Sequence, residues 1–149
     1  MNLQHPLVSF IGRLLIVYIF ATSGVAKMVD WSGNVQYMST RHLPLIPVLL
    51  AIAMVIEIVG SICLVTGLYA RTAAFIMFLY LTAVTVLFHN YWAFSGMLAG
   101  SQETHFRKNL AIMGGLLMIA AQGPGKWALG RKRATLDEAG LRAGVNSAS

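Results

Sequence analysis

The residue of this sequence with the clearest chemical potential is Glu57, which lies within the stretch LLAIAMVIEIVGSICLVTG. The apolar run around it, at about 45–70, contains no other charge. An ionised, unpaired carboxylate at this position would cost several kcal/mol in a bilayer, so the group must be protonated or paired. Small residues mark where a neighbouring backbone comes close, and three surround this carboxylate: Ala53, Gly60 and Ser61. We therefore expect Glu57 to face the interior of a helical bundle.

A second set of polar side chains repeats further along the chain, at Thr82, Thr85, His89 and Trp92. Spacings of three and four place these residues on one face of a helix. That face should turn inward or toward a partner helix rather than toward lipid. An unperturbed histidine side chain changes charge near neutral pH, and desolvation would raise the pKa of a nearby carboxyl. Such a pair is typical of proton-coupled chemistry.

Two basic residues, Arg13 and Lys27, share one face of the first apolar segment and lie about 21 Å apart along a helix axis. Each is then near one membrane interface. We expect Arg13 to extend to lipid headgroups, as long basic side chains do near helix ends. Lys27 has the same option, but it lies at the end where other polar groups gather and can instead turn inward to Glu57.

Depth along the helices predicts where the polar groups could meet. Lys27 ends the first segment and Asn109 begins the fourth on the same side of the membrane. His89 would lie about 7 Å below that surface, with Glu57 near the midplane. We expect a polar cavity there, under the first and third loops, and no catalytic residue is assigned. Its candidate ligand-binding residues are Glu57, His89, Asn109, Lys27 and Trp92.

The composition indicates a membrane environment. Of the 149 residues, 57% are hydrophobic and 11% are charged, whereas about 25% of an average soluble domain is charged. A spanning helix needs roughly 20 apolar residues, and four segments qualify: 7–29, 45–67, 72–94 and about 106–122. The predicted fold is all-α, a polytopic membrane protein with a four-transmembrane-helix bundle. We assign 1–130 to this bundle and 131–149 to a basic, disordered cytoplasmic tail.

The net charge of +6 does not indicate nucleic-acid binding, because the basic residues follow a membrane pattern. With four spans, seven of them share the side of both termini: Arg13, Arg71, Lys126, Arg131, Lys132, Arg133 and Arg142. The other side holds four, which are Lys27, Arg41, Arg107 and Lys108. The positive-inside rule then places both termini in the cytoplasm. We expect a multi-pass protein of a bacterial-type inner membrane, with the lipid bilayer as a partner.

The connections between the segments carry further predictions. The first loop places Trp31, Val35 and Met38 on one face of a short interfacial helix, which is either a lid or a plain connection. The turn at 69–71 is so short that the second and third segments must be antiparallel neighbours. Close helix contacts are expected at two pairs of small residues, Ser23 with Gly24 and Gly114 with Gly115.

Cysteine and histidine usage limits the redox chemistry. Cys63 is the single cysteine, so chemistry that passes electrons through a cysteine pair within the chain is excluded. His89 is the one histidine expected inside a span, whereas a bis-histidine haem needs two on facing helices. We therefore expect no intrinsic cofactor and no metal. A lipid quinone is the ligand that the polar residues suggest.

Five motifs follow one another along the chain: GRLLIVYIFATSGVAKMVDW, LPLIPVLLAIAMVIEIVG, TGLYAR, FHNYW and FRKNLAIMGGLLMIAAQGPG. In this order and spacing, over about 12–125, they resemble the signatures of the DoxX family of small four-helix membrane proteins. The family's characteristic positions are occupied here by Arg13, Gly24, Lys27, Glu57, Gly67, His89 and Asn109. The resemblance implies the four-helix fold and a link to membrane redox and oxidative-stress complexes. The ending KWALGRK departs from the Ser-Leu-Asp type of many relatives, so no role is assigned to a terminal acid.

Three functions fit these predictions. The first is a quinone- or redox-linked subunit, auxiliary to a quinone-linked oxidoreductase, in which Glu57 and His89 exchange protons and soluble or membrane redox proteins are partners. The second is a non-catalytic membrane scaffold or assembly factor for redox or stress enzymes, in which Glu57 with Lys27 or His89 fixes the helix register. The third is a small proton-coupled permease, although the chain lacks the broken helices and inverted repeats of transporters.

Overall fold

The computed structural model describes residues 6–129 of the chain. Within this range every regular element is helical, so the predicted all-α class is confirmed. The elements in chain order are α1 (Pro6–Val29), α2 (Trp31–Ser39), α3 (Ile46–Thr66), α4 (Ala70–Phe88), the 3₁₀ helix η1 (Tyr91–Ala93) and α5 (Gly96–Gln122). The tail predicted for 131–149 lies outside the described residues.

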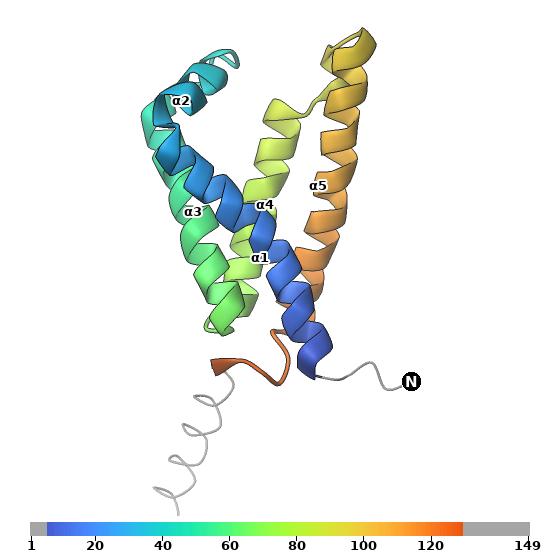
Figure 1. The fold of residues 1–149 in the computed structure, drawn as a ribbon. Coiled ribbons are helices and arrows are strands. Elements are labelled where there is room, and N and C mark those ends of the chain that lie inside the picture. Colours follow the sequence, from blue (N-terminus) through green and yellow to red (C-terminus); the bar gives the residue numbers. More distant parts are fainter. Residues whose placement is uncertain (1–5, 130–149) are drawn as a thin grey trace, which may run out of the picture.

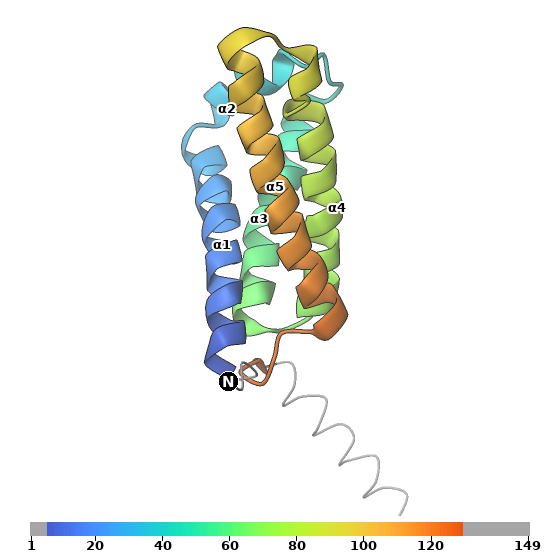
Figure 2. The same ribbon diagram turned by 90° about the vertical axis from the view of Figure 1, so that its right-hand side faces the viewer.

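Four long helices run side by side, and the short α2 lies at one end of them, next to α3 (Figure 1 and Figure 2). α1 packs mainly against α3, and α5 packs mainly against α4, while the α3–α4 contact joins the two pairs. The turn after α3 depends on Gly67, whose φ of 77° lies in the left-handed region that glycine adopts at helix ends. The predicted antiparallel pairing of α3 and α4 is thereby confirmed.

Three helical stretches are long and apolar enough to cross a membrane: Pro6–Val29, Ile46–Thr66 and Ala70–Ala93. They correspond to the first three predicted spans. The fourth predicted segment falls within α5, a helix of 27 residues. Within residues 6–129, α5 is not among the stretches that meet this test. A helix is thus present where the fourth span was expected, but its composition is less apolar.

The core lies where the long helices meet. Phe20 of α1, Leu64 of α3, Met77 of α4 and Leu116 of α5 are all at most 2% exposed. The outer faces carry large apolar side chains instead, and Leu15, for example, is 67% exposed. Such an apolar exterior is unfavourable in water and is suited to contact with acyl chains.

α4 ends earlier than predicted, at Phe88 rather than at residue 94. His89 is its C-cap, with φ of −119°, and the chain then turns through η1. Because helical spacing stops at Phe88, Trp92 does not continue the face that contains Thr85. Thr85 is buried, whereas Trp92 is 61% exposed. The stripe therefore turns inward at Thr85, whereas Trp92 is largely exposed and contacts the ring of Phe106 of α5.

The two loops predicted at the other end of the bundle are largely helical. α5 begins at Gly96, so the segment 96–105 belongs to a helix instead of to the third loop. The short helix predicted in the first loop is present as α2. The carboxylate of Asp30 caps it by accepting a hydrogen bond of 2.9 Å from the backbone N–H of Gly33. The lid function of α2 stays a prediction.

Three helices end against an arginine side chain from another element. A guanidinium at this position satisfies carbonyl groups that have no partner within their helix and complements the negative end of the helix dipole. The donor and acceptor residues are Arg13 with Leu64 and Val65 of α3, Arg41 with Phe88 of α4, and Arg71 with Gln122 of α5.

Arg13 does not extend to lipid headgroups, and that expectation is wrong. Its side chain is 1% exposed. Nη1 donates to the carbonyl oxygens of Leu64 and Val65 at 2.7 and 3.0 Å, and Nη2 donates to the carbonyl oxygen of Trp127 at 2.5 Å. The physical reason is that α3 ends at the depth of Arg13, which places unpaired carbonyl groups within its reach.

Candidate functional site

Of the two options left open for Lys27, the pairing with Glu57 is present, between α1 and α3. Nζ of Lys27 lies 2.9 Å from Oε1 and 2.8 Å from Oε2 of Glu57. Two hydroxyl groups complete the arrangement, because Ser23 Oγ donates to Oε1 at 3.1 Å and Tyr80 Oη of α4 donates to it at 2.7 Å. Nζ also donates to Ser23 Oγ at 2.6 Å. We call these four residues the polar cluster.

Two glycines let the helices approach closely enough to form the polar cluster. A Cβ atom on Gly24 of α1 would lie 2.7 Å from Cδ1 of Ile58 and 3.4 Å from Cβ of Glu57. A Cβ atom on Gly60 of α3 would lie 2.5 Å from Sδ of Met77. The first close approach brings Lys27 over the carboxylate, and the second brings α4 near enough for its tyrosine to reach the same oxygen.

The other predicted glycine contacts differ from each other. A Cβ atom on Gly115 would lie 2.9 Å from Cδ1 of Ile16, so the close helix contact predicted there is confirmed, and the structure shows that its partner is α1. A Cβ atom on Gly114 would have no neighbour within 4 Å, so the predicted contact there is wrong.

The polar cluster is closed and electrically neutral. The side chain of Glu57 is 4% exposed and that of Lys27 is 16% exposed. All the described contacts to the carboxylate come from groups that can donate a hydrogen bond, which are Lys27 Nζ, Ser23 Oγ and Tyr80 Oη. Of the two possibilities that the sequence left open, a paired carboxylate fits this geometry. The cluster links α1, α3 and α4 at one point.

His89 and Trp92 belong to a different group, at the end of α4. Nδ1 of His89 lies 2.8 Å from Oε1 of Gln102, and its ring stacks on that of His105, with centroids 5.0 Å apart. Trp92 makes edge contacts with Tyr91 and with the ring of Phe106. These contacts fasten the first half of α5 to the end of α4.

The neutral form of the His105 ring suits this stack. Burial, together with the charges of Lys108 and His89, lowers the pKa of His105 from its ordinary value. From the sequence, His105 was expected in the third loop. It lies in the first half of α5, where its ring stacks on that of His89.

Asn109 belongs to a third contact, between α5 and α4. Its Nδ2 donates to Oγ1 of Thr85 at 3.0 Å, and that hydroxyl donates to the carbonyl oxygen of Leu81 at 2.6 Å. Both side chains are buried. Asn109 therefore acts in the packing of α5 on α4.

The five predicted site residues thus fall into three groups rather than one. Only Lys27 and Glu57 are joined directly, and no hydrogen bond within residues 6–129 connects them to His89, Asn109 or Trp92. Sequence reasoning missed Tyr80, and it expected Ser23 at a close helix contact without assigning it to the carboxylate. The available signals were that Ser23 lies one helical turn before Lys27 and that Tyr80 is a hydroxyl-bearing residue deep in a predicted span.

Neither a metal site nor the main hollow of the described residues coincides with the polar cluster. The described part of the chain contains no group of three or more His, Cys, Asp or Glu residues that could hold a metal ion. A hollow of about 230 Å³ lies between α1 and α5 and includes Arg13 in its wall. This is the opposite end of α1 from Lys27, so the hollow is not the cavity predicted under the first and third loops.

Apolar helices around a buried ion pair define an all-α integral membrane protein. The model of the DoxX family matches residues 8–90 of the chain. Inner membrane protein YphA of Escherichia coli K12 is 34% identical over 128 residues, which cover 86% of this chain and 91% of YphA. Inner membrane protein YqjF of the same organism is 30% identical over 121 residues, which cover 81% and 88%. No solved structure matches. The chain belongs to the DoxX family.

Proposed function

We propose that this DoxX-family protein is a non-catalytic membrane scaffold or assembly subunit, in which the polar cluster holds three helices in a fixed arrangement. The observation that carries the proposal is the closed, neutral state of the cluster. Nζ of Lys27 uses all three of its donors on Glu57 and Ser23. A group that is fully paired stabilises one packing of its helices and offers little to a ligand.

The proposed architecture has four spans, with α5 as the fourth. α5 is 27 residues long, and its second half carries the apolar stretch 110–121. A fourth crossing brings both termini to the same side, and the positive-inside rule places that side in the cytoplasm. The names of YphA and YqjF, both inner membrane proteins, support a bacterial inner membrane as the location.

Reporter fusions test this topology. A fusion after Gly100 should give active alkaline phosphatase, because that position would be periplasmic, and a green fluorescent protein fused after Ser149 should fluoresce. A fluorescent fusion at Gly100 would reverse the orientation. If the green fluorescent protein at Ser149 is expressed well but does not fluoresce, and alkaline phosphatase is active at both positions, α5 does not cross the membrane.

A quinone- or redox-linked subunit is the second candidate function. It is favoured by one feature of the polar cluster, in which Lys27, Ser23, Glu57 and Tyr80 form a continuous chain of groups that can donate or accept a proton. Such a chain could accompany electron transfer by a bound lipid quinone. The partners would be soluble or membrane redox proteins.

Purification from native membranes in a mild detergent separates the two functions. The scaffold proposal expects a partner protein to be retained and lipid quinone to be present well below one per chain after solvent extraction. Tyr80→Phe is the matched variant, because it removes one exchangeable proton and keeps the ring. About one quinone per chain in wild type, lost in a Tyr80→Phe protein of unchanged stability, would overturn the scaffold proposal and establish the second function.

A further inference from the structure

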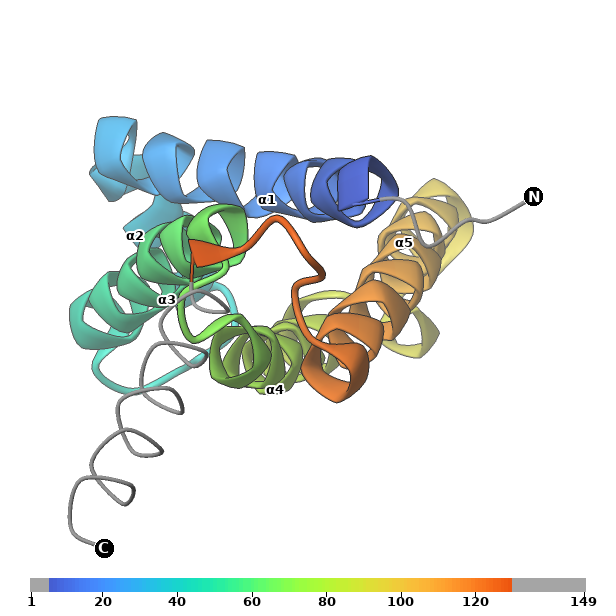
Figure 3. The same cartoon turned by 90° about the horizontal axis from the view of Figure 1, so that it is seen from below.

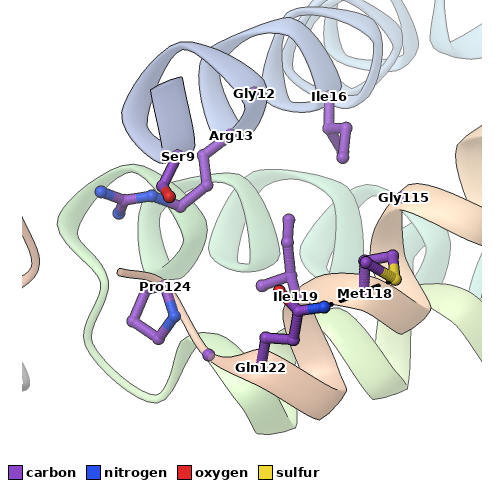
Figure 4. A pocket seen from close by; sticks show the side chains of 10 residues that line it. Ser9, Gly12, Arg13, Ile16, Gly115, Met118, Ile119, Gln122 and Pro124 are labelled. Atoms are coloured by element: carbon purple, nitrogen blue, oxygen red, sulfur yellow. Dashed lines mark hydrogen bonds between the residues drawn. The ribbon is translucent and has the colours of Figure 1, made fainter. Parts of the chain in front are cut away.

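The hollow between α1 and α5 is open at one side and has a wall of mixed polarity. Its volume is about 230 Å³. Figure 4 shows α1 on one side and α5 on the other, with the segment that follows α5 beside them. The residues that line it are Ser9, Gly12, Arg13, Ile16, Gly115, Met118, Ile119, Gln122, Gly123 and Pro124.

The hollow lies at the end of the bundle, at the depth where headgroups of a bilayer would be. Ser9 is in the first turn of α1, and Gln122 is the last residue of α5. Seen from this end, the segment after α5 crosses from α5 toward α3 (Figure 3), where Nη2 of Arg13 holds the carbonyl oxygen of Trp127. A ligand here could place a polar head at the interface and an apolar part along the helices.

Arg13 supplies a positive charge that the described residues do not neutralise. Its side chain is 1% exposed and its partners are carbonyl oxygens, with no carboxylate among residues 6–129 in an ion pair with it. Its Nε is buried and has no hydrogen-bond partner in the same range. In a region of low dielectric constant, a nearby anion stabilises such a charge.

The rest of the wall divides by polarity. Ile16, Met118 and Ile119 make its deeper part apolar, whereas Ser9 and Gln122 lie nearer the helix ends. Among the described residues, the amide Nε2 of Gln122 contacts the sulfur of Met118 at 3.8 Å. No acidic residue lines the hollow. The wall thus suits an amphiphile with an anionic head.

We propose that this hollow binds an anionic phospholipid. Its phosphate lies beside Arg13, within reach of Ser9 and Gln122, and part of one acyl chain packs against Ile16 and Met118. The site is separate from the polar cluster and does not depend on either proposed function, because Arg13 and Lys27 are about 21 Å apart along α1.

Two glycine variants test occupation of the hollow in the full-length protein. Gly12 lines it, and a Cβ atom there would meet nothing within 4 Å, so Gly12→Leu adds bulk to the wall of the hollow with no close contact at its Cβ. Gly114→Leu is the matched control, because Gly114 is also in a helix and also has an open Cβ position but does not line the hollow. The measurement is native mass spectrometry of detergent-purified protein titrated with dioleoylphosphatidylglycerol or, separately, with dioleoylphosphatidylcholine.

Wild type and Gly114→Leu should bind phosphatidylglycerol about fivefold more tightly than phosphatidylcholine, the difference expected for one basic residue near the membrane surface. Gly12→Leu should lose this binding while its melting temperature stays close to that of Gly114→Leu. A folded Arg13→Gln protein should lose the preference for the anionic lipid. If Arg13→Gln does not fold, the comparison of Gly12→Leu with Gly114→Leu tests the proposal by itself.

Three results would overturn the proposal. The first is equal affinity of wild type for the two phospholipids, which would mean that the site does not distinguish an anionic headgroup from a zwitterionic one. The second is unchanged phosphatidylglycerol binding by Gly12→Leu. The third concerns ubiquinone, titrated in the same way. If wild type binds ubiquinone tightly, and Gly12→Leu loses this binding but keeps phosphatidylglycerol, the hollow binds a neutral quinone instead.

Discussion

Replacing Glu57 by leucine is expected to lower the free energy of unfolding by about 3 kcal/mol, at the low end of what breaking a buried ion pair costs. Within residues 6–129, the substitution leaves Ser23 as the one hydrogen-bond partner of Lys27 Nζ and removes the carboxylate of its ion pair. The low end applies because Lys27 is 16% exposed and can recover some hydration. The measurement is thermal unfolding in a mild detergent, with wild type at the same pH.

Two companion variants identify charge as the cause. Glu57→Gln keeps an oxygen that accepts from Tyr80 but removes the charge, so it should lose most of the same stability. A double variant, Glu57→Leu with Lys27→Met, removes both charges and should regain most of the loss, since an apolar pair can replace a buried ion pair at little cost. A Glu57→Leu protein as stable as wild type would show that the polar cluster does not hold the helices together.

The helical spans were predictable because each rests on one local property, the length of an apolar run. Their ends were less predictable because they depend on neighbours. The polar segment 96–105 was expected to be a loop, yet it is helical, and the ion pair of 2.6 Å between Glu103 and Arg107 is of the i, i+4 kind that supports an exposed helix. The stacking of His105 on His89 adds a tertiary contact that spacing does not reveal.

The candidate site was predicted in part, for a geometric reason. Helical spacing placed Glu57 in the interior, and its burial confirms this. Spacing does not fix the rotation of one helix relative to another, so the choice between Lys27 and His89 as its partner stayed open. Tyr80 was missed because most of its side chain is an aromatic ring, so a tyrosine within an apolar segment is counted among the apolar residues. The close approach at Gly60 is what brings that hydroxyl to the carboxylate.

Arg13 shows where a general rule failed. The expectation that a basic residue near a helix end extends to headgroups assumes that headgroups are its best acceptors. Here the end of α3 offers two carbonyl oxygens at 2.7 and 3.0 Å, and the segment after α5 offers a third. These acceptors come from residues more than 50 positions away in the chain, so no local pattern reveals them.

Replacing Arg13 by methionine should therefore cost roughly 2–4 kcal/mol of unfolding free energy, because each carbonyl group left buried without a donor costs about 1–3 kcal/mol and some will find water. Arg71→Met is the matched control. Arg71 also donates to the last carbonyl group of a helix, at 3.3 Å from Gln122, but it is exposed. Its loss should change the unfolding free energy by about 0.5 kcal/mol or less. Both variants are compared with wild type by thermal unfolding in detergent.

A second measurement distinguishes the loss of this particular anchor from general destabilisation. Nη2 of Arg13 holds the carbonyl oxygen of Trp127, and Lys126 directly before it is a trypsin site. A protease can cut there only when the segment leaves the end of the bundle. Arg13→Met should thus be cut after Lys126 faster than wild type at temperatures well below its unfolding transition, whereas Glu57→Leu, destabilised elsewhere, should not. If all three proteins are cut at the same rate in their folded range, Arg13 does not anchor the segment, and the carbonyl contacts at the end of α3 alone must account for its burial.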